Sequence, residues 1–190
     1  FELVIDEADF LTGDNLWISK DRIIAHEMAH AMMAASGMDW LTSTSIPGWF
    51  KEGSAEYLAG ANERLKGSLS ILGSAQNVVN AIDASPSSSH FYSAGYVATR
   101  YLDKLLNDAG KNMKTFMKQL ATGESFDQTV NFQLGMSESQ FKSNFLANGA
   151  SFIETLNLTG SGSILGDSLA DEDVISDTPN PIQADHFKYI

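Results

Sequence analysis

The sequence predicts an α+β domain that is mainly helical, with a small sheet at its N-terminal side. Apolar residues recur at helical spacing over most of the chain from residue 22 to residue 156. The first six residues, by contrast, are rich in strand formers. The 190 residues include 43% hydrophobic side chains, which is enough for the ordinary core of one domain.

The predicted sheet lies at the start of the chain. Residues 1–6 are expected to form a β-strand, and Trp17 and Ile18 a second, short strand. The acidic stretch Asp6–Asp14 between them contains Gly13 and is predicted to be a loop. Its carboxylates make it a candidate Ca²⁺ site, although their spacing matches no EF-hand and a solvated charge run is the competing interpretation.

Two helices are predicted next. The first covers about residues 22–35, and Ser19 or Asp21 can cap its N-terminus. Its apolar face is predicted to consist of Ile23, Ile24, Met28, Ala31 and Met32. The second helix covers about residues 49–59, with Pro47 in its first turn, where the missing N–H costs nothing.

The rest of the chain is predicted to be helical, followed by an acidic arm. Residues 60–73 are mixed and punctuated by glycine, so no element is assigned there. Further helices are expected at about 75–82, 92–106, 112–121, from Ser125 onward, and 137–146 with an extension over 149–156. After residue 157, Gly, Ser, Asp and Pro dominate, and six acids face one lysine. The chain is therefore divided into a folded domain, 1–157, and an extended arm, 158–190.

The net charge of −12 and the residue inventory exclude several classes of function. A chain this acidic is repelled by nucleic acid and by anionic membrane surfaces, so neither is expected as a partner. The apolar runs are too short for a membrane-spanning helix. The chain has no cysteine, which excludes disulfide scaffolds and thiolate metal sites. A metal site must therefore use carboxylates and some of the four histidines.

One motif carries specific chemistry: His26-Glu27-Met28-Ala29-His30, inside the first predicted helix. Side chains four residues apart share a helix face, so His26 and His30 can reach the same metal ion. Glu27 would lie beside that ion, where a general base is needed. Two imidazoles plus a carboxylate are typical of a catalytic Zn²⁺ site. The competing interpretations are a surface pair of histidines with a glutamate, or an inactive site that keeps the motif.

The motif leaves the third zinc ligand open. The metzincin pattern requires Gly at position 33 and His at position 36, but these positions hold Met33 and Ser36, so that class is excluded. His90, at the end of a serine-rich loop, and His186, in the arm, are interpreted as surface residues. The third ligand is therefore expected to be a carboxylate.

Glu52 and Glu56 in the second predicted helix are the candidates for that carboxylate. They lie four residues apart and share a helix face. One of them can bind zinc, and the other can accept the N–H of a ligating histidine and fix its tautomer. A solvated helix edge is the alternative interpretation of the pair.

The two helices together resemble the gluzincin peptidases, which hold zinc with two histidines and one glutamate. The run Trp-Phe-Lys-Glu-Gly-Ser-Ala-Glu-Tyr at 49–57 is similar to a motif of bacterial collagenases. The stretches 26–34, 59–64 and 92–102 are in addition similar to flagellinolysin, the metallopeptidase domain in the variable region of some bacterial flagellins. The resemblance covers about residues 1–157.

This resemblance implies a zincin-like catalytic domain with a small N-terminal sheet, an active-site helix, a glutamate helix and a helical C-terminal subdomain. It implies that Glu52 is the third zinc ligand and that Glu56 orients a ligating histidine. It also implies an extracellular or cell-surface location, with the bacterial flagellum as one setting, and a chain that is part of a larger filament or surface protein. Collagenase-like peptidases use a Ca²⁺ ion near the zinc, which supports the calcium interpretation of the acidic loop.

The predicted function is that of a zinc-dependent endopeptidase acting on extracellular proteins or peptides. Zinc activates water and polarises the peptide carbonyl, and Glu27 accepts a proton and passes it to the leaving amine. The developing oxyanion needs a further donor. The resemblance favours Tyr92 and Tyr96, at the start of a predicted helix, and His90 is a third candidate. The alternative function is a non-catalytic surface or filament-displayed binding module that retains a structural metal.

Overall fold

The computed structural model describes residues 20–37, 43–84 and 90–158, which form eight α-helices and no strand. The helices are α1 (Lys20–Ala35), α2 (Gly48–Ala59), α3 (Asn62–Leu72), α4 (Ala75–Ile82), α5 (Phe91–Asp108), α6 (Met113–Leu120), α7 (Phe126–Leu134) and α8 (Glu138–Thr155). The prediction of a mainly helical domain is confirmed for this part of the chain. None of the described helices combines the length and the apolar character needed to cross a membrane.

Several predictions concern residues outside the described ranges. The strands at 1–6 and 17–18 and the acidic loop Asp6–Asp14 are among them, and so are His186 and the arm after residue 158. The small sheet, the calcium site and the zincin type of fold therefore stay predictions.

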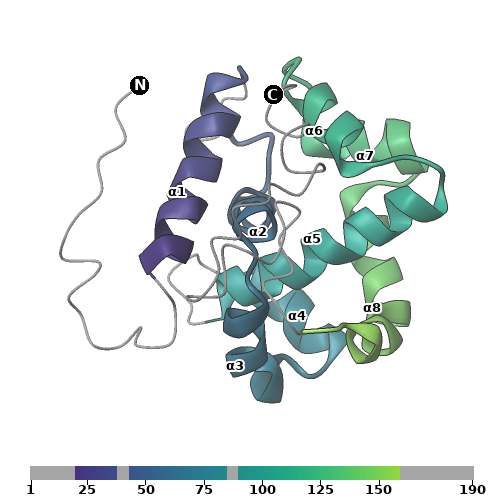
Figure 1. Ribbon diagram of the computed structural model, residues 1–190. Coiled ribbons are helices and arrows are strands. Elements are labelled where there is room, and N and C mark those ends of the chain that lie inside the picture. Colours follow the sequence, from purple (N-terminus) through teal and green to yellow (C-terminus); the bar gives the residue numbers. More distant parts are fainter. Residues whose placement is uncertain (1–19, 38–42, 85–89, 159–190) are drawn as a thin grey trace.

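Helix α2 lies at the centre of the described helices, and Figure 1 shows it nearly end-on between α1 and α5. It packs most extensively against α5, and next against α1. α5 in turn contacts α3, α4, α7 and α8, whereas α1, within the described residues, packs extensively against α2 alone. α2 therefore presents one face to α1 and another to the larger body of helices around α5.

Two glycines bring α2 and α5 into backbone contact. A Cβ atom on Gly53 would lie 2.2 Å from the carbonyl oxygen of Gly95, and one on Gly95 would lie 2.6 Å from the carbonyl oxygen of Trp49. Neither position can carry a side chain without separating the helices, because backbone atoms form the obstacle. Gly53 therefore fixes how closely α2 sits on α5, and with it the positions of Glu52 and Glu56.

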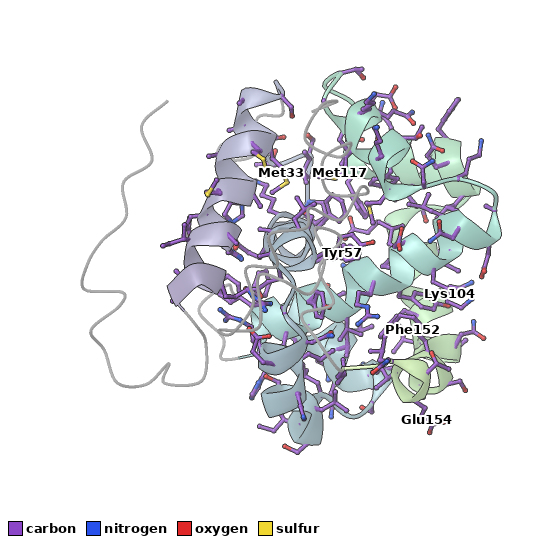
Figure 2. The ribbon with its side chains drawn as sticks, in the orientation of Figure 1. Met33, Tyr57, Lys104, Met117, Phe152 and Glu154 are labelled. Carbon is purple, nitrogen blue, oxygen red and sulfur yellow. The ribbon has the colours of Figure 1, made fainter. Side chains whose placement is uncertain are left out.

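The face of α2 that meets α5 also carries aromatic residues into the core. Trp49 and Phe50 are buried, and their ring centroids lie 5.2 and 4.9 Å from that of Phe126 on α7. Edge-to-face and tilted contacts at this separation stabilise a core beyond the burial of apolar area. Figure 2 shows Tyr57, also on α2, in the interior, whereas Glu154 on α8 lies at the outer edge.

The face by which α1 meets α2 differs from the predicted one. Met28, predicted to be apolar core, is 47% exposed. The other four residues of the predicted face are half-buried: Ile23, Ile24, Ala31 and Met32. The buried residues of α1 are instead Arg22, His26, Ala29 and Met33. The apolar pattern gave the wrong face because two of these four positions are polar and find partners on neighbouring helices.

Helix α3 forms in the segment 60–73, for which no element was predicted. Its N-cap residue, Ala61, makes no side-chain hydrogen bond to the helix, so the usual start signal is missing. Leu65, Leu69 and Leu72 do follow helical spacing, and all three pack into the core. The helical spacing of these leucines was therefore present in the sequence, but the glycine within the segment argued against a helix.

The remaining helices agree with the predicted ranges to within two residues. Ser125 and Ser137 form capping boxes at the starts of α7 and α8. Pro47 is the N-cap of α2 and precedes its first turn. α8 continues without a break through Gly149, so the predicted extension over 149–156 belongs to the same helix.

Candidate metal centre

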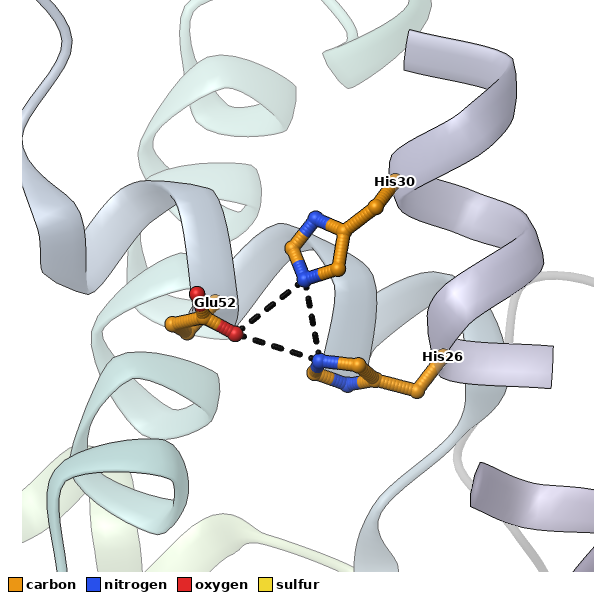
Figure 3. A group of neighbouring side chains, drawn as sticks. All are labelled: His26, His30 and Glu52. Atoms are coloured by element: carbon orange, nitrogen blue, oxygen red, sulfur yellow. Dashed lines mark hydrogen bonds and ion pairs between the residues drawn. The ribbon is translucent and has the colours of Figure 1, made fainter. Parts of the chain in front are cut away.

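Two histidines of α1 and one glutamate of α2 converge on one point (Figure 3). The Nε2 atoms of His26 and His30 each lie 3.1 Å from Oε2 of Glu52, and they lie 3.0 Å from each other. Tetrahedral ligands at the usual zinc distances lie about 3.3 Å apart. The three atoms therefore form a triangle of suitable size and donor type, and the cluster can hold a metal ion.

Helix geometry explains why these side chains meet. His26 and His30 are one turn apart on the face of α1 that packs on α2. Glu52 and Glu56 are likewise one turn apart, on the face of α2 that meets α1. About one turn of each helix therefore supplies four polar side chains to one small volume.

The two glutamates take different positions around the His26 ring. Glu52 Oε2 lies 3.1 Å from Nε2, whereas Glu56 Oε1 lies 3.1 Å from Nδ1 at the other side of the ring. The Glu52 side chain is 24% exposed and that of Glu56 only 1%. The residues alone left the two roles open. The structure places Glu52 at the shared ligand point and Glu56 behind His26.

Burial and charge together set the protonation of the cluster without a metal ion. Burial lowers the pKa of His26, but its contacts with Glu52 and Glu56 outweigh this and raise the pKa to about 9. Burial raises the pKa of Glu52, but His26 and His30 outweigh this and lower it to about 2. The pKa of Glu56 is also lowered, since His26 and Arg64 overcome the effect of burial. A metal ion can therefore replace the proton on His26 while both carboxylates stay ionised.

Arg64 of α3 completes the surroundings of Glu56. Its Nε atom lies 3.2 Å from Glu56 Oε1, and its guanidinium lies over the Tyr92 ring, 5.1 Å from the centroid. The Tyr92 ring is in turn 5.8 Å from the His26 ring. No role for Arg64 was predicted from the sequence. The one signal for it was its place in the stretch 59–64 that resembles flagellinolysin.

Glu27 and Tyr92 both lie near the cluster. Glu27 is half-buried on α1, directly after His26. Burial raises the pKa of the Tyr92 phenol, and the negative charges of Glu52, Glu56 and Glu27 raise it further. Tyr92 is therefore within electrostatic reach of three carboxylates of the site, including the predicted general base.

Tyr96 and His90 lie in other surroundings. The Tyr96 side chain is fully buried, and its hydroxyl donates to Asn62 Oδ1 at 2.9 Å. Arg100 also donates to Asn62 Oδ1, at 3.1 Å, and lies over the Tyr96 ring. His90 is the half-buried N-cap residue of α5. The structure thus brings Tyr92 beside the histidines and places Tyr96 in a buried polar network.

Comparisons with known proteins give no match: none to a family model, none to a curated protein and none to a solved structure. The class of site therefore follows from its own geometry. It is a cluster of two histidines and one glutamate, between two helices of a mainly helical domain, that can hold a metal ion.

Proposed function

We propose that the protein is a zinc-dependent endopeptidase of the gluzincin type. The observation that carries the proposal is the convergence of His26, His30 and Glu52, with Glu27 directly beside the first of them. Two histidine nitrogens and one carboxylate oxygen are the donor set of open catalytic zinc sites. The side chains of His30 and Glu52 are 23% and 24% exposed, which supports access of a substrate to the point between them.

Each residue of the site then has a defined task. When bound, zinc supplies a Lewis acid that activates water and polarises a peptide carbonyl. Glu27 accepts a proton from the attacking water and delivers it to the leaving amine. Glu56 keeps a proton on Nδ1 of His26, so that Nε2 is free to bind the metal. Tyr92 donates a hydrogen bond to the carbonyl oxygen as its negative charge develops, and we assign Tyr96 to the core.

The setting of the activity rests on the motif resemblance of 26–34 and 49–57. It supports protein or peptide segments outside the cell as substrates. It also supports a secreted or surface-displayed parent protein, with a bacterial flagellar filament as one case. A cleavage-site profile on a proteome-derived peptide library would define the preference.

Glu27→Gln tests the proposal most directly. The substitution removes the base but no ligand, so we expect kcat to fall by about 10²–10⁴-fold while zinc content is unchanged. Glu154→Gln is the matched control, because Glu154 is exposed on α8. A chelator should abolish activity and added zinc should restore it.

Two results would contradict the proposal. Full activity of Glu27→Gln would show that the mechanism is wrong. Stoichiometric zinc without turnover of any unfolded protein or peptide by the unmodified chain would instead support the non-catalytic module that retains a structural metal.

A further inference from the structure

The Glu56 carboxylate is held from two sides by residues of two different helices. Oε1 lies 3.1 Å from Nδ1 of His26 on α1 and 3.2 Å from Nε of Arg64 on α3. Glu56 itself is 1% exposed, so solvent does not balance its charge. A buried carboxylate that loses its cationic partner is strongly destabilising, because its charge is left uncompensated. The position of Glu56 therefore depends on both contacts.

Metal binding removes the positive charge from one of the two partners of Glu56, the His26 ring. A histidine that binds a metal through Nε2 is neutral and keeps its proton on Nδ1. His26 then offers Glu56 a hydrogen-bond donor but no charge. Arg64 stays cationic at every pH of interest. In the metal-bound protein, Arg64 is therefore a cation in direct contact with the carboxylate that orients His26, and the buried Arg22 also acts on that carboxylate through its charge.

Arg64 also contacts the tyrosine beside the site. Its guanidinium lies 5.1 Å from the Tyr92 ring centroid, within the range of a cation–π interaction. The Tyr92 ring lies 5.8 Å from the His26 ring. One arginine thus contacts both the partner of a ligand and the proposed oxyanion donor.

We propose that Arg64 is a positioning residue of the metal centre: it holds Glu56 against His26 and Tyr92 beside it, and so orients a ligand without touching the metal. The part of this inference that concerns zinc affinity and catalysis rests on the proposed zinc function. The part that concerns the contact between His26 Nδ1 and Glu56 Oε1 does not.

Arg100 on α5 provides a matched control for Arg64 on α3. Its guanidinium lies over the Tyr96 ring at 5.6 Å and donates to the buried Asn62 at 3.1 Å. Arg100 thus repeats the two kinds of contact that Arg64 makes, a tyrosine ring and a buried oxygen. It contacts neither Glu56 nor His26 in the described structure. Arg100→Met therefore reports the general cost of losing such an arginine.

The experiment compares Arg64→Met, Arg64→Lys and Arg100→Met in the full chain. Nitrogen-detected NMR of the four histidines, without metal, follows the Nδ1 proton of His26, which is assigned with His26→Gln. We expect this proton to exchange faster in Arg64→Met and to be unchanged in Arg100→Met. Competition with a chromophoric chelator then measures zinc affinity, which should fall roughly tenfold in Arg64→Met. Arg64→Lys, which keeps the charge, should recover part of that loss.

A double variant separates positioning from general destabilisation. If Arg64 acts through Glu56, then the double variant with Arg64→Met and Glu56→Gln should bind zinc almost as well as Glu56→Gln alone. Additive effects, an unchanged Nδ1 proton in Arg64→Met, or equal losses in Arg64→Met and Arg100→Met would each overturn the inference. Should Arg64→Met not fold, Arg64→Gln takes its place. If the unmodified chain binds no zinc but the Nδ1 proton responds as expected, the proposed function fails and the positioning role stands.

Discussion

The two faces of α2, a helix of twelve residues, differ in their side chains and in what they pack against. The face toward α5 is apolar and so closely packed that Gly53 touches the backbone of α5. The face toward α1 carries Glu52 and Glu56, whose charges meet histidines across the interface. One face packs against α5, and the other presents the carboxylates of the candidate metal site. The close packing of the first face therefore sets where the second face lies.

α1 is attached to the other described helices largely through polar contacts. α1 buries only Ala29 and Met33 among its apolar residues, together with Arg22 and His26. Much of its attachment to the described body is therefore polar, through ion pairs such as that of Arg22 with Glu63 at 2.9 Å. A metal ion shared by α1 and α2 would join the two helices more strongly than those pairs, since it binds only the folded arrangement.

Breaking the packed face should have the largest effect. Gly53→Ala places a methyl group 2.2 Å from the Gly95 carbonyl oxygen, so α2 and α5 must separate. We expect the free energy of unfolding to fall by about 3 kcal/mol or more, with loss of zinc binding as a consequence. Urea unfolding followed by circular dichroism measures this.

Gly48→Ala is the control for that prediction, because it lies on the same helix. Its added Cβ would meet only the Phe91 ring at 3.5 Å, an ordinary contact. Its unfolding free energy should stay within about 1 kcal/mol of the unmodified chain. Equal stability of the two variants would mean that the glycine contact does not set the α2–α5 distance.

The sequence predicted the fold well where local signals agree and poorly where they conflict. The predicted helices at 92–106, from Ser125 onward and from 137 onward agree with α5, α7 and α8, and Ser125 and Ser137 cap the last two. The buried face of α1 was wrong because Arg22 and His26 are buried through partners that lie 41 and 26 residues further along the chain. Hydrophobic periodicity cannot detect such long-range pairs, since it considers only the polarity of each side chain.

Changing the polar face should remove the site and leave the fold. Glu52→Ala deletes one of the three converging atoms but no core contact, because Glu52 is 24% exposed. Zinc affinity should fall by more than the roughly 10–100-fold that the loss of an outer partner costs. The loss of zinc affinity in Glu56→Ala should lie within that range. Chelator competition measures both, and a larger loss in Glu56→Ala would show that the two roles are exchanged.

The site illustrates the same limit on sequence reasoning. His26, His30 and the glutamate pair could be predicted because one helical turn fixes their relative positions. Arg64 could not, since its role depends on how α3 returns to α2, which no local spacing encodes. Tyr92 and Tyr96 were indistinguishable in sequence because both lie on the inner side of α5. The crossing of helices decides which of them lies beside the histidines.

Those two tyrosines give a third, smaller test. Tyr92→Phe removes the proposed donor to the oxyanion, so we expect kcat to fall about 100-fold with little change in stability. Tyr96→Phe removes a hydroxyl that donates to Asn62, so we expect about 1 kcal/mol of lost stability with little change in kcat. Steady-state kinetics and thermal unfolding of both variants measure this. Equal losses of kcat in the two variants would contradict the prediction that only the Tyr92 hydroxyl acts at the site.

The last prediction concerns how pH acts on stability with and without zinc. The pKa of His26 rises from 6.5 to about 9 on folding without metal, so its stabilisation is complete below pH 6.5 and disappears as the pH rises toward 9. The pKa of Glu52 falls from 4.5 to about 2, so its stabilisation is present above pH 4.5 and disappears only in acid. The melting temperature of the metal-free protein should therefore decline between pH 6.5 and 9.

Zinc should reverse this trend, because it competes with the proton on His26. As the pH rises toward 9, less proton must be displaced, zinc binds more tightly, and the stabilisation it gives to the folded state grows. Thermal unfolding at several pH values between 6 and 8.5, in excess chelator and in buffered zinc, measures both slopes. His26→Gln should flatten both of them. A metal-free melting temperature that rises over this range, or a zinc-induced shift that stays constant, would mean that His26 does not exchange its proton for the metal.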